Sequence, residues 1–216
     1  MGLNRLIIVD GCSPLHVNAY KLASGAEEIL ERAEEMITLG EAISEMGCVV
    51  GMTSREGRGR SSPLSPEAMA KQLMPLSLKN RVGLVFGPEK DGLTNEELSL
   101  CHLYARIPSS QSFPSLNLAQ AVVVICYELF KYSDGVLEKT RELAPAEHLE
   151  KMFKHMEKTF IEIGFLDPNH PESIMRALRE LFGRSFPDER EVRILQGILS
   201  QMDWQLGRRR KIDGGG

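Results

Sequence analysis

The stretch Leu84-Val-Phe-Gly-Pro-Glu-Lys-Asp-Gly-Leu-Thr-Asn-Glu-Glu97 passes from an apolar run through a polar turn into the start of a helix. The apolar run ends at Gly87, which indicates that a buried strand stops there. Thr94 and Glu97 have the spacing of a capping box, in which two side chains bind the free amides at a helix start. This order of elements predicts an α/β fold with parallel strands, whose turns lie at the carboxyl edge of the sheet, where ligands bind.

Three residues of this turn indicate a candidate binding site. Gly87 and Gly92 allow the backbone to approach a ligand closely. Glu89 places a carboxylate at the same edge of the sheet. A turn whose glycines only meet backbone requirements would have the same sequence, so the local pattern leaves both interpretations open.

Along the first part of the chain, apolar runs typical of buried strands alternate with helical patterns, which predicts a parallel sheet with helices on both faces. The expected strands are residues 5–10, 48–53, 81–86 and 103–107. Two further capping boxes, Ser24 with Glu27 and Thr38 with Glu41, predict two helices between the first two strands. The apolar segment 116–130 is long enough for a mostly buried helix.

The pattern changes after residue 133, where no strand-like run follows and apolar residues recur at helical spacing. The domain boundaries that we expect are a first domain at 1–132, a linker at 133–145, a helical extension at 146–206 and a flexible basic tail at 207–216. For the tail, a solvated segment is favoured over an arm that binds nucleic acid.

The composition is that of a globular protein, with 216 residues, 24.1 kDa, 42% hydrophobic and 26% charged side chains. No apolar run approaches the roughly 20 residues of a membrane span, and no signal pattern opens the chain, so we expect a soluble cytoplasmic protein without a membrane partner. The net charge of −4 argues against a strongly basic nucleic-acid-coating protein but leaves a small basic patch open.

The cysteines and histidines show no ligand spacing. Cys12, Cys48, Cys101 and Cys126 lie far apart in or beside apolar segments, and we interpret them as reduced core thiols. The five histidines are equally scattered. We therefore expect no metal site.

Two more strand ends carry polar loops. Ser115 and Asn117 lie near the start of the apolar helix, where their commonest role is to cap it. Arg55, Arg58 and Arg60 follow the strand at 48–53 and supply enough positive charge to hold RNA phosphates. A solvated loop is an equally weighted alternative for these arginines.

Taken in order, these segments resemble the motifs of the SPOUT superfamily of RNA methyltransferases, specifically the SpoU/TrmH-like ribose 2′-O-methyltransferases that act on tRNA. Phe86-Gly-Pro-Glu-Lys-Asp-Gly-Leu93 is similar to the second motif of that family. Ile107-Pro108 with Ser115-Leu-Asn-Leu-Ala-Gln-Ala121 is similar to the third. Gly51-Met-Thr-Ser-Arg55 is similar to the segment before them, and the region after residue 145 resembles the helical extension of the tRNA-acting branch.

The resemblance implies a C-terminal trefoil knot in the sheet domain, a homodimer, and transfer of a methyl group from S-adenosylmethionine to a ribose 2′-hydroxyl of RNA, with tRNA as the expected substrate. The residues that it places at the cofactor are Thr53, Gly87, Ile107, Ser115, Leu116 and Asn117. Glu89 is implied to support that site. The candidate catalytic residues are Ser115, Asn117, Glu89 and Arg55, and the candidate RNA-binding residues are Arg55, Arg58 and Arg60.

One departure concerns the family's first motif, which carries a catalytic arginine. The sequence begins at Met1-Gly-Leu-Asn-Arg-Leu6, which resembles the segment at the end of that motif. Three explanations for the missing part of the motif are open, and we rank them in this order: Met1 is an internal methionine taken for a start, the chain is truncated, or the protein is a natural variant without activity. Arg55 and Arg5 are candidates to replace the catalytic arginine, but nothing in the sequence positions either guanidinium at the reacting hydroxyl. The alternative function is therefore a catalytically impaired protein that binds cofactor or RNA.

Overall fold

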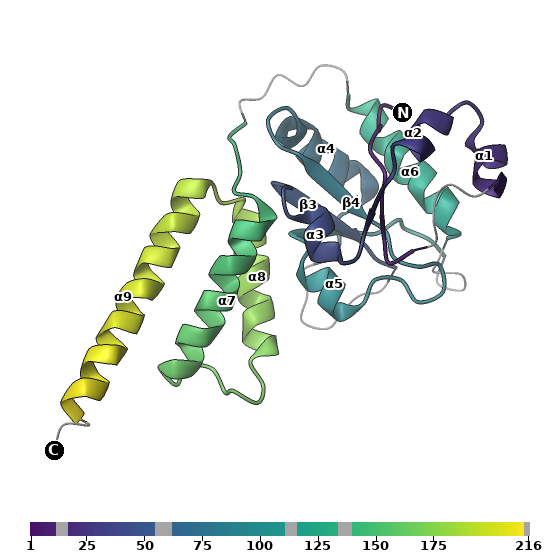
Figure 1. Ribbon diagram of the computed structural model, residues 1–216. Helices are drawn as coiled ribbons and strands as arrows, with labels where there is room; N and C mark the ends of the chain where they lie inside the picture. Colours follow the sequence, from purple (N-terminus) through teal and green to yellow (C-terminus); the bar gives the residue numbers. More distant parts are fainter. Residues whose placement is uncertain (12–16, 55–61, 111–115, 134–139, 214–216) are drawn as a thin grey trace.

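The computed structural model describes residues 1–11, 17–54, 62–110, 116–133 and 140–213 (Figure 1). The strands are β1 (Ile7–Val9), β2 (Glu34–Met36), β3 (Cys48–Met52), β4 (Val82–Val85) and β5 (Leu103–Ala105). The helices of the first part are α1 (Val17–Ala23), α2 (Glu27–Glu31), α3 (Leu39–Ile43), α4 (Pro66–Ser77), α5 (Asn95–Ser99) and α6 (Leu118–Lys131). The extension contains α7 (Ala146–Glu162), α8 (Glu172–Ser185) and α9 (Glu189–Asp213).

All strand pairs of the described residues are parallel. β3 lies between β4 and β5, and β1 pairs with β2 in a separate two-stranded sheet. In the central strand Val50 is paired with Leu84 on one side and with Leu103 on the other. The predicted parallel α/β arrangement is confirmed, and each of the four predicted strands is present in a shorter form.

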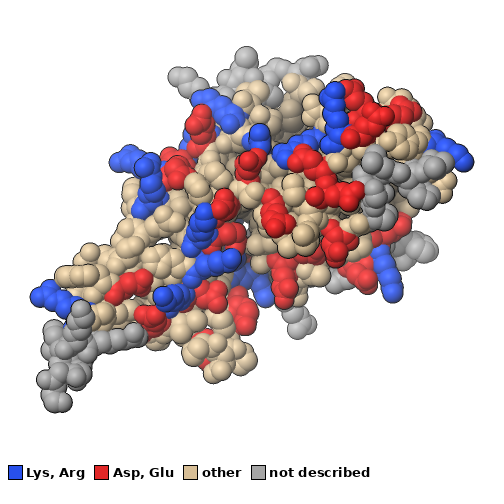
Figure 2. All heavy atoms as spheres, viewed as in Figure 1, with Lys and Arg blue, Asp and Glu red and all other residues tan. Residues whose placement is uncertain are grey.

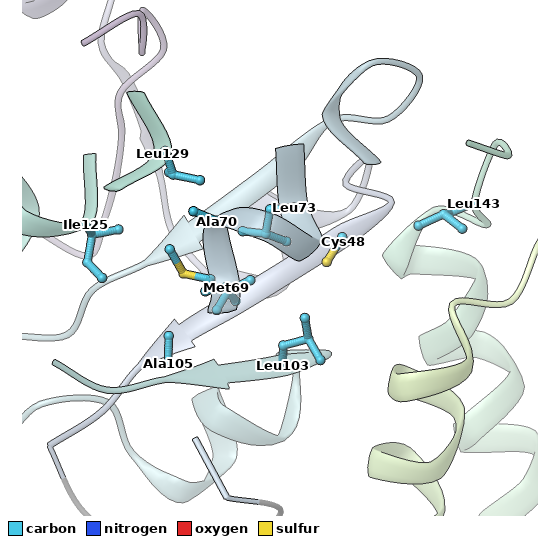
Figure 3. Packing of buried hydrophobic residues seen from close by; sticks show 10 residues of the cluster. Cys48, Met69, Ala70, Leu73, Leu103, Ala105, Ile125, Leu129 and Leu143 are labelled. Atoms are coloured by element: carbon cyan, nitrogen blue, oxygen red, sulfur yellow. The ribbon is translucent and has the colours of Figure 1, made fainter. Parts of the chain in front are cut away.

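One face of the three-stranded sheet packs against α4 and α6. Successive side chains of a strand point to opposite faces, so Cys48 and Val50 share this face of β3. Figure 3 shows Met69 and Leu73 of α4 directed at the same core as Cys48, with α6 contributing from beside them. Two helices, α4 and α6, therefore cover this face of the sheet.

The opposite face packs against α3, α5 and the beginning of α7. Val49 and Tyr104 are buried here against Ile43 of α3 and Leu98 of α5, and Ala146 belongs to the same cluster. Helices therefore cover both faces, as the alternating pattern predicts. The burial of β3 on both sides explains its continuous apolar sequence.

The region between β1 and β3 differs from the prediction. It contains a third helix and a strand, β2, whose sequence Glu34-Glu-Met36 is short and mostly charged. Among the described residues β2 pairs only with β1, and a strand at a sheet edge tolerates charge. An apolar pattern cannot reveal such a strand.

Three capping boxes were predicted, and two are confirmed. Thr38 with Glu41 and Thr94 with Glu97 each make both hydrogen bonds of the motif. The prediction of a cap at Ser24 is wrong, because α2 begins after Ala26 and lacks a side-chain cap. The Glu27 carboxylate instead accepts a hydrogen bond from the Gly25 amide, 3.3 Å away.

Helix α4 was not predicted, although its start carries a clear signal. Ser65 accepts a hydrogen bond from the Ala68 amide, and Pro66 occupies the first helical position. Serine at the cap followed by proline is typical of a helix N-terminus, because proline lacks the amide that would be left free there.

The segment at 140–145, within the predicted linker, is bound to both parts of the molecule. Asn80 accepts a hydrogen bond from the Leu143 amide (2.7 Å) and donates to the Arg141 carbonyl (3.0 Å). Arg141 donates in turn to the Phe186 carbonyl at the end of α8 (2.7 Å). The extension is thus attached through ordered contacts on either side of this segment.

The extension has its own core, formed by residues such as Met152, Met175 and Leu199 from its three helices. α9 extends through Asp213, so its last turns include residues 207–213 of the predicted tail. Arginine and lysine have high helix propensity, and Gly207 costs only about 1 kcal/mol in a helix interior. None of the helices in the described ranges is both long enough and apolar enough to cross a membrane.

Candidate functional site

A pocket of about 390 Å³ opens where the carboxyl ends of β3, β4 and β5 meet the start of α6. Each strand leads into the loop that the sequence singled out, so segments far apart in the chain share one hollow. The lining residues are Met52, Thr53, Ser54, Phe86, Gly87, Pro88, Glu89, Lys90, Asp91, Gly92, Leu93, Ala105, Ile107, Leu116, Leu118, Ala121 and Ile125. The position agrees with the rule that ligands bind at the carboxyl edge of parallel sheets.

Asn117 links the two loops on which the sequence prediction depends. Its side-chain Nδ2 donates to Glu89 Oε1 at 2.6 Å. Its Oδ1 accepts from the amides of Ala119 (3.0 Å) and Gln120 (3.4 Å) at the start of α6. Asn117 is therefore a helix cap, as its position suggested, and it also holds the Glu89 carboxylate at the rim of the pocket.

Gly87 is required by the turn itself. A methyl group at this position would overlap the backbone nitrogen of Leu93 and the carbonyl carbon of Gly92. Gly92 has φ +65°, a conformation that favours glycine, and its amide donates to the Pro88 carbonyl at 2.8 Å. Both glycines thus allow the loop after β4 to fold back on itself, and this compact turn forms one wall of the pocket.

The structure brings most of the predicted site residues together. Thr53, Gly87, Ile107, Leu116 and Glu89 line the pocket, and Asn117 contacts it through Glu89. Ser115, Arg55, Arg58 and Arg60 lie outside the described residues. Arg5 is not among the lining residues, and its guanidinium binds Glu34 through two hydrogen bonds of 2.6 and 3.0 Å.

The pocket walls combine apolar and charged groups. Phe86 and Ile125 were not assigned to the site by sequence reasoning, and they contribute apolar surface from the end of β4 and from α6. Lys90 and Asp91 add opposite charges beside Glu89. Phe86, Lys90 and Asp91 belong to the segment 84–97, and their position next to the end of a strand could have indicated that they line the pocket. Ile125 had no such signal, because it lies in the middle of an apolar helix.

None of the cysteines in the described residues lines the pocket. Burial raises the pKa of Cys48 and of Cys101 to about 12, which keeps both as neutral thiols. Cys126 is also a free thiol, and burial raises its pKa. Within the described part of the chain, no three His, Cys, Asp or Glu side chains form a group that could hold a metal ion.

Comparison with known proteins identifies the family. Residues 1–127, more than half of the chain, match the SpoU rRNA methylase family. The chain belongs to this SpoU family. Residues 147–213 match a second domain family, the C-terminal domain of the tRNA methyltransferase TrmJ. The two matches correspond to the sheet domain and the helical extension.

Several SpoU-family proteins are similar over almost the whole chain. The tRNA (cytidine/uridine/adenosine-2′-O-)-methyltransferase TrmJ of Pseudomonas aeruginosa (strain UCBPP-PA14) is 40% identical, covering 93% of this chain and 84% of that protein. The tRNA (cytidine/uridine-2′-O-)-methyltransferase TrmJ of Klebsiella pneumoniae is 35% identical, covering 95% of this chain and 87% of that protein. The crystal structure of TrmJ from Z. mobilis ZM4 superposes with a TM-score of 0.76 at 33% identity, covering 94% and 88% of the two chains.

Proposed function

We propose that this SpoU-family protein transfers a methyl group from S-adenosylmethionine to a ribose 2′-hydroxyl of tRNA. The observation that carries the proposal is the pocket at which the loops after β3, β4 and β5 meet, tied by the hydrogen bond between Asn117 and Glu89. The similar proteins named as tRNA 2′-O-methyltransferases support the same reaction and substrate.

The residues present suit the cofactor. A volume of about 390 Å³ lies in the range of pockets that hold a small organic ligand. Phe86, Ile107 and Leu116 offer apolar surface for an adenine ring. The carboxylates of Glu89 and Asp91 complement the cationic sulfonium and ammonium groups of the cofactor. We assign Thr53, Gly87, Ile107, Ser115, Leu116 and Asn117 to this cofactor site.

In the proposed reaction, bound S-adenosylmethionine supplies an electrophilic methyl group on a sulfonium centre. Transfer of that methyl group to the ribose oxygen would release S-adenosylhomocysteine, and the hydroxyl proton would pass to solvent. The pocket residues accelerate this exchange mainly by alignment, because holding two reactants in line removes much of the entropic barrier. The Glu89 carboxylate is held in place by the hydrogen bond from Asn117. Ser115 is a further candidate catalytic residue, because it belongs to the segment that resembles the third motif of the family. A cation that favours the alkoxide would aid proton loss, and Arg55 is our candidate for that role.

We also propose a homodimer that uses α6. Val123, Tyr127 and Phe130 follow one another at helical spacing, and their exposed fractions are 54%, 51% and 53%. A stripe of three large apolar residues on one helix is typical of a protein interface. The homodimer places this stripe between two copies, next to the pocket that begins at the same helix.

Three further features follow from the family pattern. We propose that the chain after β4 and β5 forms the trefoil knot of the SPOUT fold. Arg55, Arg58 and Arg60 are proposed to bind RNA phosphates. A tRNA-modifying enzyme acts where tRNA is processed, so we propose a cytoplasmic location.

Two measurements test the proposed function. Calorimetric titration with S-adenosylhomocysteine should show binding to the pocket, and a tritium-methyl assay should show transfer to an unmodified tRNA transcript. Binding without transfer would favour a catalytically impaired binding protein. The absence of both would contradict the proposal. An Ala substitution at Asn117 that left the affinity unchanged would remove that residue from the site.

A further inference from the structure

One face of α9 carries arginines near both ends of its described side chains and a tryptophan beside the second group. The residues on this face recur at intervals of three or four positions and are all exposed; they are Arg190, Arg193, Gly197, Gln201, Trp204 and Arg208. Eighteen residues of helix span about 27 Å, so the arginines at the two ends are separated by roughly that distance. No carboxylate belongs to this face.

The described carboxylates of α9 contact residues of α7 and of the linker, away from the arginine-bearing face. Glu189 contacts His148 at 2.8 Å, Glu191 accepts a hydrogen bond from Arg141 at 3.1 Å, and Asp203 accepts one from Thr159 at 2.6 Å. These contacts hold α9 against α7 and the linker. As a result, positive charge is left on the face that points away from them.

The three arginines of this face have no acidic partner within ion-pair distance among the described side chains. Arg193 donates only to the Glu189 carbonyl, at 3.3 Å. Elsewhere in the chain, Arg81 is paired with Glu45 and Arg179 with Glu150. Figure 2 shows many acidic side chains over the α/β body, with lysines and arginines among them. The arginine-bearing face of α9 contains no carboxylate, although the protein as a whole has a net charge of −4.

Trp204 is the only tryptophan of the chain, and 53% of it is exposed. The Arg208 guanidinium lies 5.3 Å from the centre of its ring, within the range of a cation–π contact. A large aromatic surface left in water costs free energy unless a partner covers it. An indole ring flanked by arginine is a platform on which an unpaired nucleobase stacks, and stacking tolerates any base because each has a π face.

The extension holds this face at a fixed position relative to the pocket. The first two amides of α7 donate to the carbonyls of Met46 (2.9 Å) and Ser44 (3.1 Å) at the end of α3. α8 packs on β5, where a methyl group at Gly183 would lie 2.7 Å from the His102 carbonyl oxygen. Figure 1 shows α9 on the outer side of the extension, away from the sheet. A macromolecule that spans both regions is therefore needed to contact the pocket and α9 together.

We propose that this face of α9 binds the RNA substrate, with Arg190, Arg193 and Arg208 at phosphates and Trp204 stacked on an unpaired base. The inference rests on the proposed function for the identity of the RNA. Charge complementarity favours RNA over a second copy of this acidic chain. An apolar protein partner would fit the neighbouring stripe of Ile194, Ile198 and Met202 instead.

The single tryptophan allows a direct test on the unaltered protein. Titration with an unmodified tRNA transcript should quench the Trp204 emission, and added salt should restore it as phosphate contacts are lost. A blunt RNA duplex without unpaired bases should quench the emission less than the tRNA. Emission that changes with protein concentration in the absence of RNA would mean that a second copy covers Trp204, and would overturn the proposal.

Variants separate stacking from charge. Trp204→Ala should weaken tRNA binding about tenfold, and Trp204→Phe should retain most of the affinity, because it keeps a stacking ring. Replacing Arg190, Arg193 and Arg208 together by alanine should reduce the slope of log affinity against log salt by about 2. Arg184→Ala is the matched control, because Arg184 makes the same backbone contact on α8 that Arg193 makes on α9, at 3.3 Å in each case.

The outcomes distinguish this proposal from the proposed function. Methylation of a bound tRNA with unchanged Trp204 emission and an unaltered salt slope in the triple variant would overturn the role of α9 and leave the function standing. Quenching by tRNA without methyl transfer or S-adenosylhomocysteine binding would support the α9 surface and contradict the function. A tRNA that does not bind at all would overturn the proposal.

Discussion

The side-chain amide of Asn117 donates a hydrogen bond to the carboxylate of Glu89, with 2.6 Å between Nδ2 and Oε1. These residues are 28 positions apart and come from the loops that follow β4 and β5. Asn117 also caps α6, so one side chain sets both the start of a helix and the position of a carboxylate. This coupling makes the pocket sensitive to small changes at residue 117.

Asn117→Ala should lower affinity for S-adenosylhomocysteine and also destabilise the fold by about 1 kcal/mol, the usual cost of a lost cap. Asn117→Asp separates the two effects, because aspartate caps a helix equally well but places a second carboxylate against Glu89. We expect near-normal thermal stability and weak binding for Asn117→Asp. Calorimetry and thermal unfolding of both variants measure this, and normal binding by Asn117→Asp would exclude a role for the amide.

Gly87→Ala should disrupt the pocket more severely than Gly92→Ala. The added methyl group at Gly87 would overlap the backbone of Gly92 and Leu93, which cannot move without opening the turn. We expect a loss of more than about 2 kcal/mol in unfolding free energy, together with loss of cofactor binding. In Gly92→Ala the added methyl group would lie in open space, so the expected loss of unfolding free energy is only the cost of a positive φ for alanine, about 1 kcal/mol. Urea denaturation of the two variants compares them, and equal stabilities would contradict this account of the turn.

His102 should make the protein sensitive to acid. Its Nδ1 accepts the Val49 amide at 2.9 Å, and burial, followed by the nearby Arg179 charge, lowers its pKa from 6.5 to about 4. The unfolded chain therefore binds a proton that the folded chain excludes, and stability falls as pH drops from 6.5 towards 4. The loss reaches at most about 3 kcal/mol at the lower end and vanishes above the unfolded pKa.

The control for this pH effect is His102→Asn, whose Oδ1 can accept the same amide and does not titrate. Urea denaturation across this pH range should show a shallower dependence for the variant than for the unaltered protein. Parallel pH profiles for the two proteins would assign the acid sensitivity to other groups, such as Asp203, whose pKa is lowered by hydrogen bonds from Thr159 and His155.

Tyr127→Glu should convert the proposed homodimer to a monomer, because it places a charge in the middle of the exposed stripe of α6. Light scattering coupled to size-exclusion chromatography measures the mass directly. Leu181→Glu is a suitable control, since Leu181 on α8 is exposed to a similar extent (52%) and lies outside the stripe. A dimer that persists in Tyr127→Glu would place the interface elsewhere.

Replacing Arg55, Arg58 and Arg60 together by alanine should weaken tRNA binding and flatten its salt dependence, because each lost phosphate contact changes the slope by about 0.7 to 0.9. Affinity measured by fluorescence anisotropy at several salt concentrations checks this. An unchanged slope would favour the solvated-loop interpretation of these residues.

Much of the fold could be predicted because its signals are local. The buried strands are short apolar runs, and Thr94 with Glu97 makes a capping box whose geometry depends on four adjacent residues. Prediction failed where local signals were weak or were outweighed. β2 has a charged sequence and is held by pairing with β1, and α9 continues past Gly207 although the residue after it begins a basic run.

The sequence by itself determined the parallel α/β architecture, the strand-end loops and the family, because periodicity, caps and ordered motifs are properties of neighbouring residues. Only the tertiary structure decided that Asn117 holds Glu89 and that the described carboxylates of α9 contact α7 and the linker, which leaves Arg190, Arg193 and Arg208 without an acidic partner among the described side chains. Such relationships depend on which distant segments are packed together and on which charges are neutralised there. A contact between residues far apart in the chain has no signature in either segment alone.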